Sequence, residues 1–121
     1  MLCREHAVDI IHPDLLTTGG ILETKKIGDM AQEYGVPMAL HCAHTPIGAL
    51  ASAHVAAATE NFLVLENHAV DVPYWSDLVD GVEKPIVNKG YITVSLQLDG
   101  AVEIASGQTQ AAVVPGARAL H

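Results

Sequence analysis

The first seventy residues alternate between two kinds of block. Three short runs, 8–13 (VDIIHP), 36–42 (VPMALHC) and 61–68 (NFLVLENH), are nearly continuous in apolar residues, which predicts buried strands. Between them, apolar residues recur at helical spacing over 21–34, and an Ala-rich stretch covers 46–59. The pattern therefore predicts the order strand, helix, strand, helix, strand. Gly and Pro residues at the block boundaries suit the ends of these helices.

This order is typical of a parallel sheet covered by helices, the α/β class. Polar residues end the predicted strands at regular intervals: Asp14 and His41 are 27 positions apart, and His41 and Glu66 are 25. Each interval matches one strand–helix unit, because a closed barrel of eight such units takes about 250 residues. Residues 1–70 are therefore predicted to form a partial (β/α) barrel with about three parallel strand–helix units.

The pattern changes after residue 70. Residues 71–105 contain the only Trp and then short apolar stretches, separated by Lys89-Gly90 and Asp99-Gly100, dipeptides typical of tight turns. This segment is predicted to be a loop followed by a short β exit segment. Residues 106–121 show no periodicity and are predicted to be a disordered tail.

The composition restricts the class of protein. Six Lys and Arg stand against 14 Asp and Glu, a net charge of −8, which argues against a nucleic-acid partner because phosphate binding needs clustered basic residues. A membrane partner is not expected either, since the chain is acidic and no apolar run approaches the length of a membrane span. With two cysteines and no secretory signal, a reduced, cytoplasmic protein is the expectation.

Asp14, His41 and Glu66 are the main candidates for chemistry, because the carboxyl ends of parallel strands form the rim where α/β proteins place their active sites. A carboxylate beside an imidazole fixes its tautomer and raises its basicity, so Asp14 and His41 can form a general acid/base pair. Glu66 can donate or accept a hydrogen bond at an oxyanion formed during proton abstraction. The alternative without chemistry is that Asp14 caps the following turn, His41 is hydrogen-bonded in the core and Glu66 is solvated.

The sequence HCAH raises a second possibility, a zinc site, since His41, Cys42 and His44 are residue types that zinc accepts. Neighbours along a strand point to opposite faces, however, so His41 and Cys42 cannot easily share an ion. No second Cys/His cluster supplies further ligands, and the sequence alone therefore assigns no metal ligand. His68 lies just past Glu66 and can line the same rim.

Together these residues resemble a known family. An Asp before a helix opened by TTGG, a strand-end His in HCAHTPIG and a Glu ending the next strand in ATENFLVLENH stand in register. With them, residues 7–94 resemble the C-terminal barrel segment of the mandelate racemase/muconate-lactonizing branch of the enolase superfamily, and within it the acid-sugar dehydratases. PIVNKGYITV resembles the stretch by which such chains leave the barrel. The resemblance implies that the three strands are the last of a TIM-type barrel.

The resemblance also implies roles for the three candidates. Asp14 pairs with His41, the general acid/base, and Glu66 is the hydrogen-bonding acid at the substrate carboxylate or enediolate oxygen. Family members abstract the proton α to a carboxylate and stabilise the enediolate on Mg²⁺, and dehydration of a small acid sugar (an aldonate or aldarate) is the common outcome. The resemblance places the Mg²⁺ ligands and the opposing lysine base on earlier strands, so Mg²⁺ is implied without ligands in this chain.

Two hypotheses follow from the sequence. In the first, the chain is the C-terminal part of an acid-sugar dehydratase-like enzyme. In the second, it is a non-catalytic, truncated barrel that forms a homo-oligomer or completes a barrel with a partner chain. The second hypothesis rests on the strand edges, because three parallel strands alone leave two edges that favour association with other chains.

Overall fold

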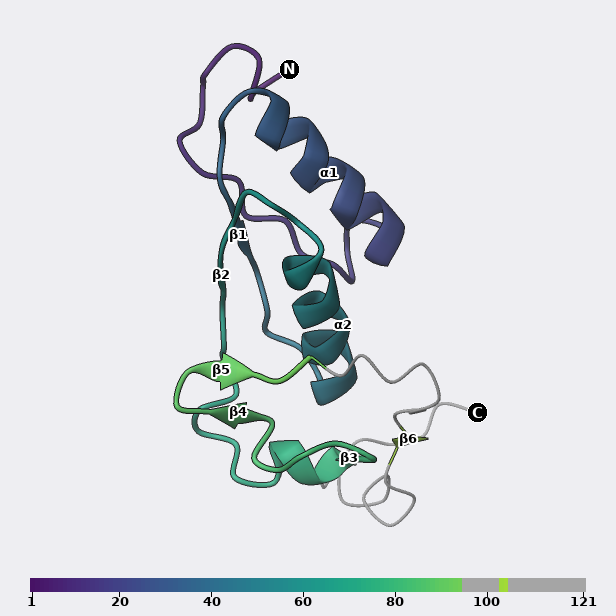
Figure 1. The fold of residues 1–121 in the computed structure, drawn as a ribbon. Helices are drawn as coiled ribbons and strands as arrows, with labels where there is room; N and C mark the ends of the chain where they lie inside the picture. Colours follow the sequence, from purple (N-terminus) through teal and green to yellow (C-terminus); the bar gives the residue numbers. More distant parts are fainter. Residues whose placement is uncertain (95–102, 105–121) are drawn as a thin grey trace, which may run out of the picture.

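The computed structural model describes residues 1–94 and 103–104 and contains a small α/β fold followed by short β elements (Figure 1). The first part consists of α1 (Ile21–Glu33), β1 (Met38–Leu40), α2 (Pro46–Ala57) and β2 (Phe62–Leu65). The second part consists of a 3-10 helix, η1 (Trp75–Leu78), and the two-residue strands β3 (Val79–Asp80), β4 (Val87–Asn88), β5 (Tyr91–Ile92) and β6 (Glu103–Ile104). No helix in the described ranges has the length and apolar character needed to cross a membrane.

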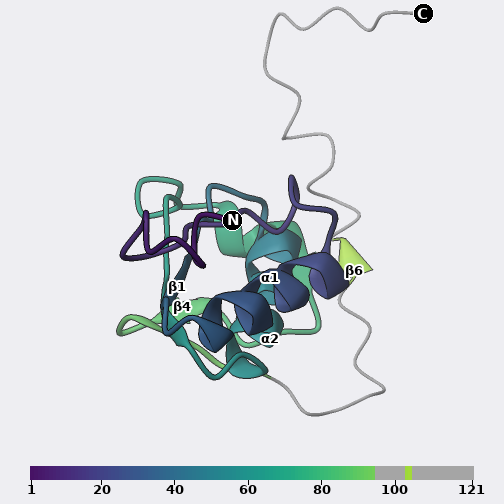
Figure 2. The ribbon, with the colours of Figure 1, turned by 90° about the horizontal axis from the view of Figure 1, so that it is seen from above.

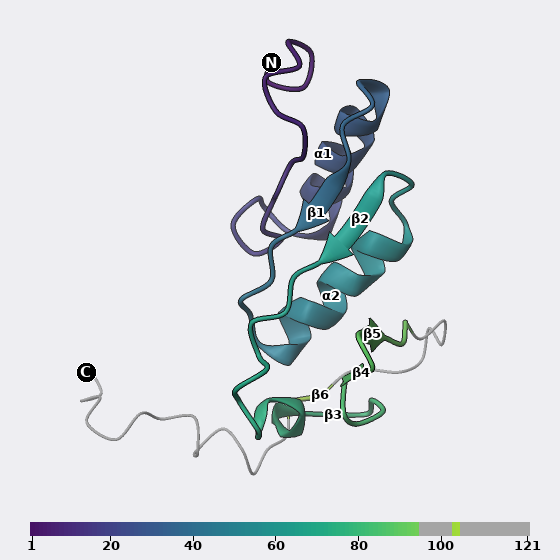
Figure 3. The ribbon, with the colours of Figure 1, turned by 90° about the vertical axis from the view of Figure 1, so that its left-hand side faces the viewer.

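The two predicted helices and the second and third predicted strands are confirmed. β1 and β2 pair in parallel, joined by α2, so this part of the chain is a βαβ unit. α1 and α2 lie side by side, as the view from above shows (Figure 2). Both helices lie on the same side of the strand pair, and the opposite side carries no helix of the described part (Figure 3). The predicted α/β layering is therefore present.

The predicted strand over 8–13 is wrong as a regular strand. Its residues run parallel to β1, but only as isolated bridges, at Ile11 with Met38 and at Asp14 with His41. Pro13 has no N–H, so the ladder hydrogen bond expected at the carbonyl of Ala39 is missing at this position. The ring Nδ1 of His12 lies 2.9 Å from that carbonyl oxygen and takes the place of the missing donor.

Glycine and proline mark the helix ends as the sequence predicts. Gly35, just past α1, has a φ of 69°, a left-handed conformation that suits the residue after a helix. Its N–H and that of Val36 donate to the last carbonyls of α1, at Gln32 and Ala31. α2 begins at Pro46, where a missing N–H removes no helical hydrogen bond. These ends fix how far each helix runs before the chain returns to the strands.

Two apolar clusters hold the fold together. One lies between the strands and α2 and is built from Leu15, Met38, Leu40, Val55 and Ala56. The other lies between α2 and the segment after β2 and is built from Cys42, Ala49, Leu50, Trp75, Val79 and Ile86. Because the second cluster contains residues of both parts, the exit segment packs against the rim of the strands.

The exit segment carries the predicted turn at Lys89-Gly90. Both residues have a positive φ, 51° and 83°, and they join β4 and β5 into an antiparallel hairpin. Positive φ at both central positions is the twist that two-residue hairpins need. β3 pairs with β6. The predicted turn at Asp99-Gly100 and the predicted tail over 106–121 lie outside the described residues.

Candidate active site

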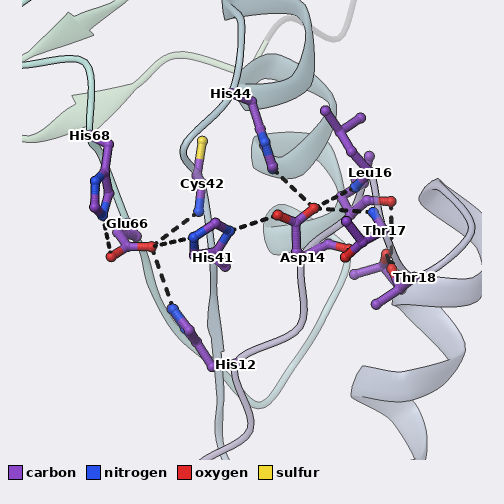
Figure 4. Close-up of polar contacts among 12 residues, drawn as sticks. His12, Asp14, Leu16, Thr17, Thr18, His41, Cys42, His44, Glu66 and His68 are labelled. Atoms are coloured by element: carbon purple, nitrogen blue, oxygen red, sulfur yellow. Dashed lines mark hydrogen bonds and ion pairs between the residues drawn. The ribbon is translucent and has the colours of Figure 1, made fainter.

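The ends of the three parallel segments bring the three predicted residues together (Figure 4). Asp14 and His41 are register partners, and the N–H of His41 donates to the carbonyl of Pro13 at 3.0 Å. This backbone pairing sets the two side chains side by side, and His41 Nδ1 lies 2.7 Å from Asp14 Oδ2. Glu66 follows β2, and its N–H donates to the carbonyl of Leu40 at 2.9 Å. The backbone register therefore sets the spacing of the site.

Asp14 also caps the turn that leads to α1, as the alternative without chemistry predicts for this residue. Its Oδ1 accepts the N–H groups of Leu16 at 2.8 Å and Thr17 at 3.2 Å, while Oδ2 faces His41. Partial burial raises the pKa of Asp14, but the hydrogen bonds from His41 and Leu16 and the charge of His44 outweigh it. The net effect is a pKa below the usual 3.8, so this carboxylate stays ionised.

Glu66 is surrounded by nitrogen atoms. Its Oε1 lies 2.6 Å from His68 Nε2, and its Oε2 accepts the N–H of Cys42 at 3.3 Å. Two further imidazole nitrogens approach Oε2, His12 Nε2 at 3.4 Å and His41 Nε2 at 3.6 Å. The hydrogen bond from His68 is the main reason that the pKa of Glu66 lies below its usual 4.5. In this arrangement Glu66 is an ionised acceptor.

His41 therefore lies between two carboxylates, with Asp14 at Nδ1 and Glu66 near Nε2 (Figure 4). A neutral histidine carries one ring proton, and the hydrogen bond to Asp14 favours the tautomer with that proton on Nδ1. Nε2 is then free to accept a proton, and the resulting imidazolium has a carboxylate on each side. About a third of the His41 side chain is exposed, so a small molecule can reach it.

Two further histidines lie at the site, of which the sequence singled out only His44, as part of the HCAH zinc possibility. His12 reaches Glu66 from the preceding segment, and His44 Nε2 lies 3.4 Å from Asp14 Oδ1. A signal for His12 was available, because it precedes Asp14 by two positions and side chains two apart on an extended segment share a face. His44 follows His41 by three positions in the loop that leads to α2, and no periodicity applies to a loop.

Cys42 has no place in the rim chemistry. It is 4% exposed and belongs to the apolar cluster with Trp75. Burial raises the pKa of its thiol, and the charges of Asp14 and Glu66 act in the same direction. A thiol that resists ionisation is a poor nucleophile and a poor zinc ligand. The prediction that Cys42 is a small buried residue is confirmed.

The chain is an α/β protein with a carboxylate–imidazole pair at the carboxyl ends of its parallel strands. In (β/α) barrels this end of the strands carries the active site. The model of the enolase C-terminal domain-like family matches residues 1–100. The chain belongs to this family of the enolase superfamily, which confirms the resemblance seen in the sequence.

Curated relatives carry the names of acid-sugar dehydratases. D-xylonate dehydratase from Haloferax volcanii is 45% identical over 93 residues, 77% of this chain and 22% of the relative. Arabinonate dehydratase from Saccharolobus solfataricus is 44% identical over 57 residues, 47% of this chain and 15% of the relative. The chain thus matches about a fifth of the first relative's length and less of the second's.

Solved structures agree with this assignment. A mandelate racemase/muconate lactonizing enzyme-like protein from Rubrobacter xylanophilus superimposes with a TM-score of 0.74 and 40% identity, covering 78% of this chain and 24% of that protein. An enolase from Pseudomonas fluorescens Pf0-1, solved with bound magnesium, potassium and tartrate, superimposes with a TM-score of 0.70 and 24% identity, covering 91% of this chain and 26% of that one. At 24% identity the second likeness concerns the fold alone.

The described residues do not fit Mg²⁺. Among them, one group of three ligand-type side chains lies close enough to hold an ion, namely Asp14, His41 and His44. Mg²⁺ prefers six oxygen ligands in octahedral geometry, and this group offers two imidazole nitrogens and one carboxylate. No step of a reaction is therefore assigned here to Mg²⁺.

Proposed function

We propose that this chain supplies the acid/base half of an active site that dehydrates a small acid sugar. The observation that carries the proposal is the hydrogen bond between His41 Nδ1 and Asp14 Oδ2, 2.7 Å long, at the carboxyl ends of two parallel segments. This pairing is a structural arrangement for general acid/base catalysis near neutral pH. The names of the curated relatives support an aldonate as the substrate class.

In the proposed reaction, His41 Nε2 is the atom that exchanges a proton with the substrate. The C–H bond α to the carboxylate breaks as Nε2 of neutral His41 takes the proton, and the C–O bond to the β-hydroxyl breaks, so that one water leaves and an enol remains. His41 in its protonated form donates the proton that lets the hydroxyl depart as water. Asp14 keeps Nδ1 protonated and stabilises the imidazolium, because its own pKa lies below the usual range.

For Glu66 we propose a role that differs from the one implied by the resemblance. A carboxylate can donate a hydrogen bond only when protonated, and the hydrogen bond from His68 lowers the pKa of Glu66. Glu66 is therefore proposed to accept a hydrogen bond from a substrate hydroxyl. Its position 3.6 Å from His41 Nε2 puts that hydroxyl beside the proton-transfer atom.

A chimera tests the proposal, because the chain spans about a fifth of D-xylonate dehydratase. The matching 93 residues of the Haloferax volcanii enzyme are replaced by the corresponding residues of this chain, and dehydration of D-xylonate is followed by release of the keto acid. We expect activity with the native segment, and a loss of at least about a hundredfold with His41→Asn or Asp14→Asn.

The controls separate chemistry from folding. Lys26→Ala, on the exposed face of α1 where Lys26 pairs with Glu23, should leave the activity of the chimera unchanged. A folded chimera with the native segment and no activity would contradict the proposal, as would an active His41→Asn chimera.

A second candidate function is assembly, and the surface of β2 favours it. Leu63 and Val64 are 55% and 51% exposed although they lie in a strand of a parallel pair. They line an apolar groove of about 520 Å³ that is bounded by α2, β2 and the β4–β5 hairpin. Within the described ranges, β2 pairs on one edge only, with β1. We propose that a second copy or a partner chain covers this edge, and the mass of the chain in sedimentation tests it.

A further inference from the structure

We propose that Asp14, His41 and His44 bind a divalent transition-metal ion of the Zn²⁺ type. One ligand atom from each residue lies within 4.8 Å of the others, and the three residues come from two segments that the backbone register holds together. Zn²⁺ binds imidazole nitrogen and carboxylate oxygen at about 2.0–2.2 Å, so the three side chains must shift for ligand atoms now up to 4.8 Å apart to reach one ion.

His44 is the observation that sets this group apart from an ordinary polar cluster. Its side chain is 5% exposed, and Nε2 makes no hydrogen bond to any residue of the described part. The nearest acceptor, Asp14 Oδ1, is 3.4 Å away, and the ring is aimed at it (Figure 4). Buried polar atoms are nearly always partnered, so an imidazole nitrogen left without a hydrogen bond has a vacant bonding position.

The loop around His44 is built to hold this ring in place. Trp75 donates its indole N–H to the carbonyl of His44 at 2.9 Å. Gly48, in the first turn of α2, leaves the space that the His44 side chain occupies, since a Cβ there would lie 2.8 Å from the Cβ and 3.2 Å from the Cγ of His44. A ligand whose position is fixed before binding loses little freedom when the ion arrives.

The surroundings of the other two ligands also suit a metal. The N–H groups of Leu16 and Thr17 orient the Asp14 carboxylate. The far nitrogen of His41, Nε2, lies 3.6 Å from Glu66 Oε2. Imidazoles that bind a metal usually place their other ring nitrogen near a carboxylate, which fixes the tautomer and strengthens the ligand.

The donor set selects the type of ion. Two imidazoles and one carboxylate, with a fourth position left for water, are ligands that suit Zn²⁺ and similar ions and do not suit Mg²⁺. This site differs from the HCAH zinc site considered from sequence, because Asp14 takes the place of Cys42. Cys42 instead lies in the apolar cluster with Trp75.

Metal binding and the acid/base pairing exclude each other. The ion binds Nδ1 of His41, so the hydrogen bond from this nitrogen to Asp14 is lost. The ring proton then lies on Nε2, which can donate a hydrogen bond to Glu66. A transition-metal ion is therefore expected to block the site at which we propose acid/base chemistry. That consequence rests on the proposed function, whereas the binding itself rests on the geometry alone and is tested without an activity assay.

The test is calorimetric titration of ZnCl₂ into the full 121-residue chain, with Co²⁺ as a spectroscopic probe. We expect one ion per chain, visible Co²⁺ bands of four- or five-coordinate geometry, and no competition from a large excess of Mg²⁺. X-ray absorption of the zinc-loaded chain counts the imidazole ligands without any variant. Two imidazoles are expected, and none or four would overturn the proposal.

Variants locate the site. His44→Gln should weaken Zn²⁺ binding by about tenfold to a hundredfold or more, since even residues behind the ligands have effects of this size. His68→Gln is the matched control, because His68 belongs to the same rim cluster but lies outside the three ligands, and binding should stay within about twofold of the native chain. Thermal unfolding followed by circular dichroism confirms that both variants fold.

Two outcomes would contradict the site. The first is unchanged affinity in a folded His44→Gln chain together with a loss in His68→Gln, which would place the ion at Glu66. The second is a thiolate-to-Co²⁺ charge-transfer band that disappears in Cys3→Ser or Cys42→Ser, which would assign the binding to a cysteine. If His44→Gln does not fold, the imidazole count from X-ray absorption decides alone.

Discussion

The indole Nε1 of Trp75 donates to the carbonyl oxygen of His44 at 2.9 Å, across 31 positions of the chain. This hydrogen bond joins the exit segment to the loop between β1 and α2, the loop that carries His44. Trp75 is 8% exposed and packs in the same apolar cluster as Cys42, the residue next to His41. A residue well outside the strand–helix units thus supports the backbone of the candidate site.

Trp75→Phe should destabilise the fold modestly. The substitution keeps an aromatic ring in the cluster but removes the donor, and a single hydrogen bond contributes about 0.5–1.5 kcal/mol to stability. We expect a loss of about that size in the free energy of unfolding, measured by urea denaturation. Tyr74→Phe, at a neighbour that is 54% exposed, is the matched control and should change little. Equal losses in the two variants would contradict a role for the indole N–H.

Gly48→Ala should be destabilising for a steric reason that depends on His44. The added Cβ would lie 2.8 Å from the Cβ of His44, so one of the two residues must move. Crowding of this kind costs about 1–3 kcal/mol.

A double-mutant cycle isolates the contact between Gly48 and His44. In the His44→Gly background both the Cβ and the ring of residue 44 are gone, and Gly48→Ala should cost less or even stabilise α2 by up to about 1 kcal/mol, because Ala favours helices over Gly. The same cost in both backgrounds would show that the clash lies elsewhere.

The stability of the fold should decrease in acid through Asp14. Its pKa lies below the usual 3.8 in the folded chain, so the unfolded chain binds protons more readily. The stabilising contribution is fully present above the unfolded-state pKa and is lost as the pH falls through the lowered folded-state pKa. Urea midpoints measured from neutral pH down to about pH 3 should therefore fall less steeply for Asp14→Asn than for the native chain. Asp9→Asn, at an exposed position, should follow the native profile.

The two cysteines should react at different rates. Burial raises the pKa of Cys42, and its side chain is 4% exposed, whereas Cys3 is partly exposed. With a disulfide reagent at neutral pH, we expect one thiol to react at once and the other at least about tenfold more slowly, because only an accessible thiolate attacks. In denaturant both should react together. Rapid reaction of both thiols in the native chain, and of the one remaining thiol in Cys3→Ser, would mean that the cluster around Trp75 opens readily.

Association through β2 should be sensitive to charge. Val64→Lys places a charge on the half-exposed face of β2, which lines the apolar groove. We expect the native chain to sediment as an oligomer and the variant as a smaller species, because charges on exposed strands oppose pairing between chains. Val70→Lys, in a loop at a position that is 78% exposed, is the matched control and should leave the mass unchanged. A native monomer would contradict the proposed assembly.

The sequence predicts helices and strands well where the apolar residues follow a repeating pattern. The helical spacing over 21–34 and the apolar run over 36–42 correspond to α1 and β1, and Gly35 lies between them as predicted. The interval between Asp14 and His41 correctly anticipates their contact, because both residues end parallel segments. Patterns of this kind are set by local geometry and by burial of one face, which a sequence records.

Contacts that depend on loops could not be predicted. The pairing of His44 with Asp14 and the hydrogen bond from Trp75 to His44 both join segments that no periodicity relates. The prediction of a strand over 8–13 was wrong for a different reason. Pro13 has no N–H for the strand ladder, and the ring of His12 donates to the carbonyl of Ala39 in its place. The direction of the Glu66 pKa also needed the structure, since it depends on where His68 points.

The bridge between Asp14 and His41 has a consequence for how such a chain can change over evolutionary time. Because the two residues are partners in one backbone register, their spacing is independent of the length and surface of the helix that connects them. Mutations and small insertions in the outer turns of α1, where Leu22 and Met30 are already exposed, can accumulate without moving either side chain. The sequence of the segment between the two residues can therefore change, whereas a shift of the backbone register by one position at Pro13 would separate the pair.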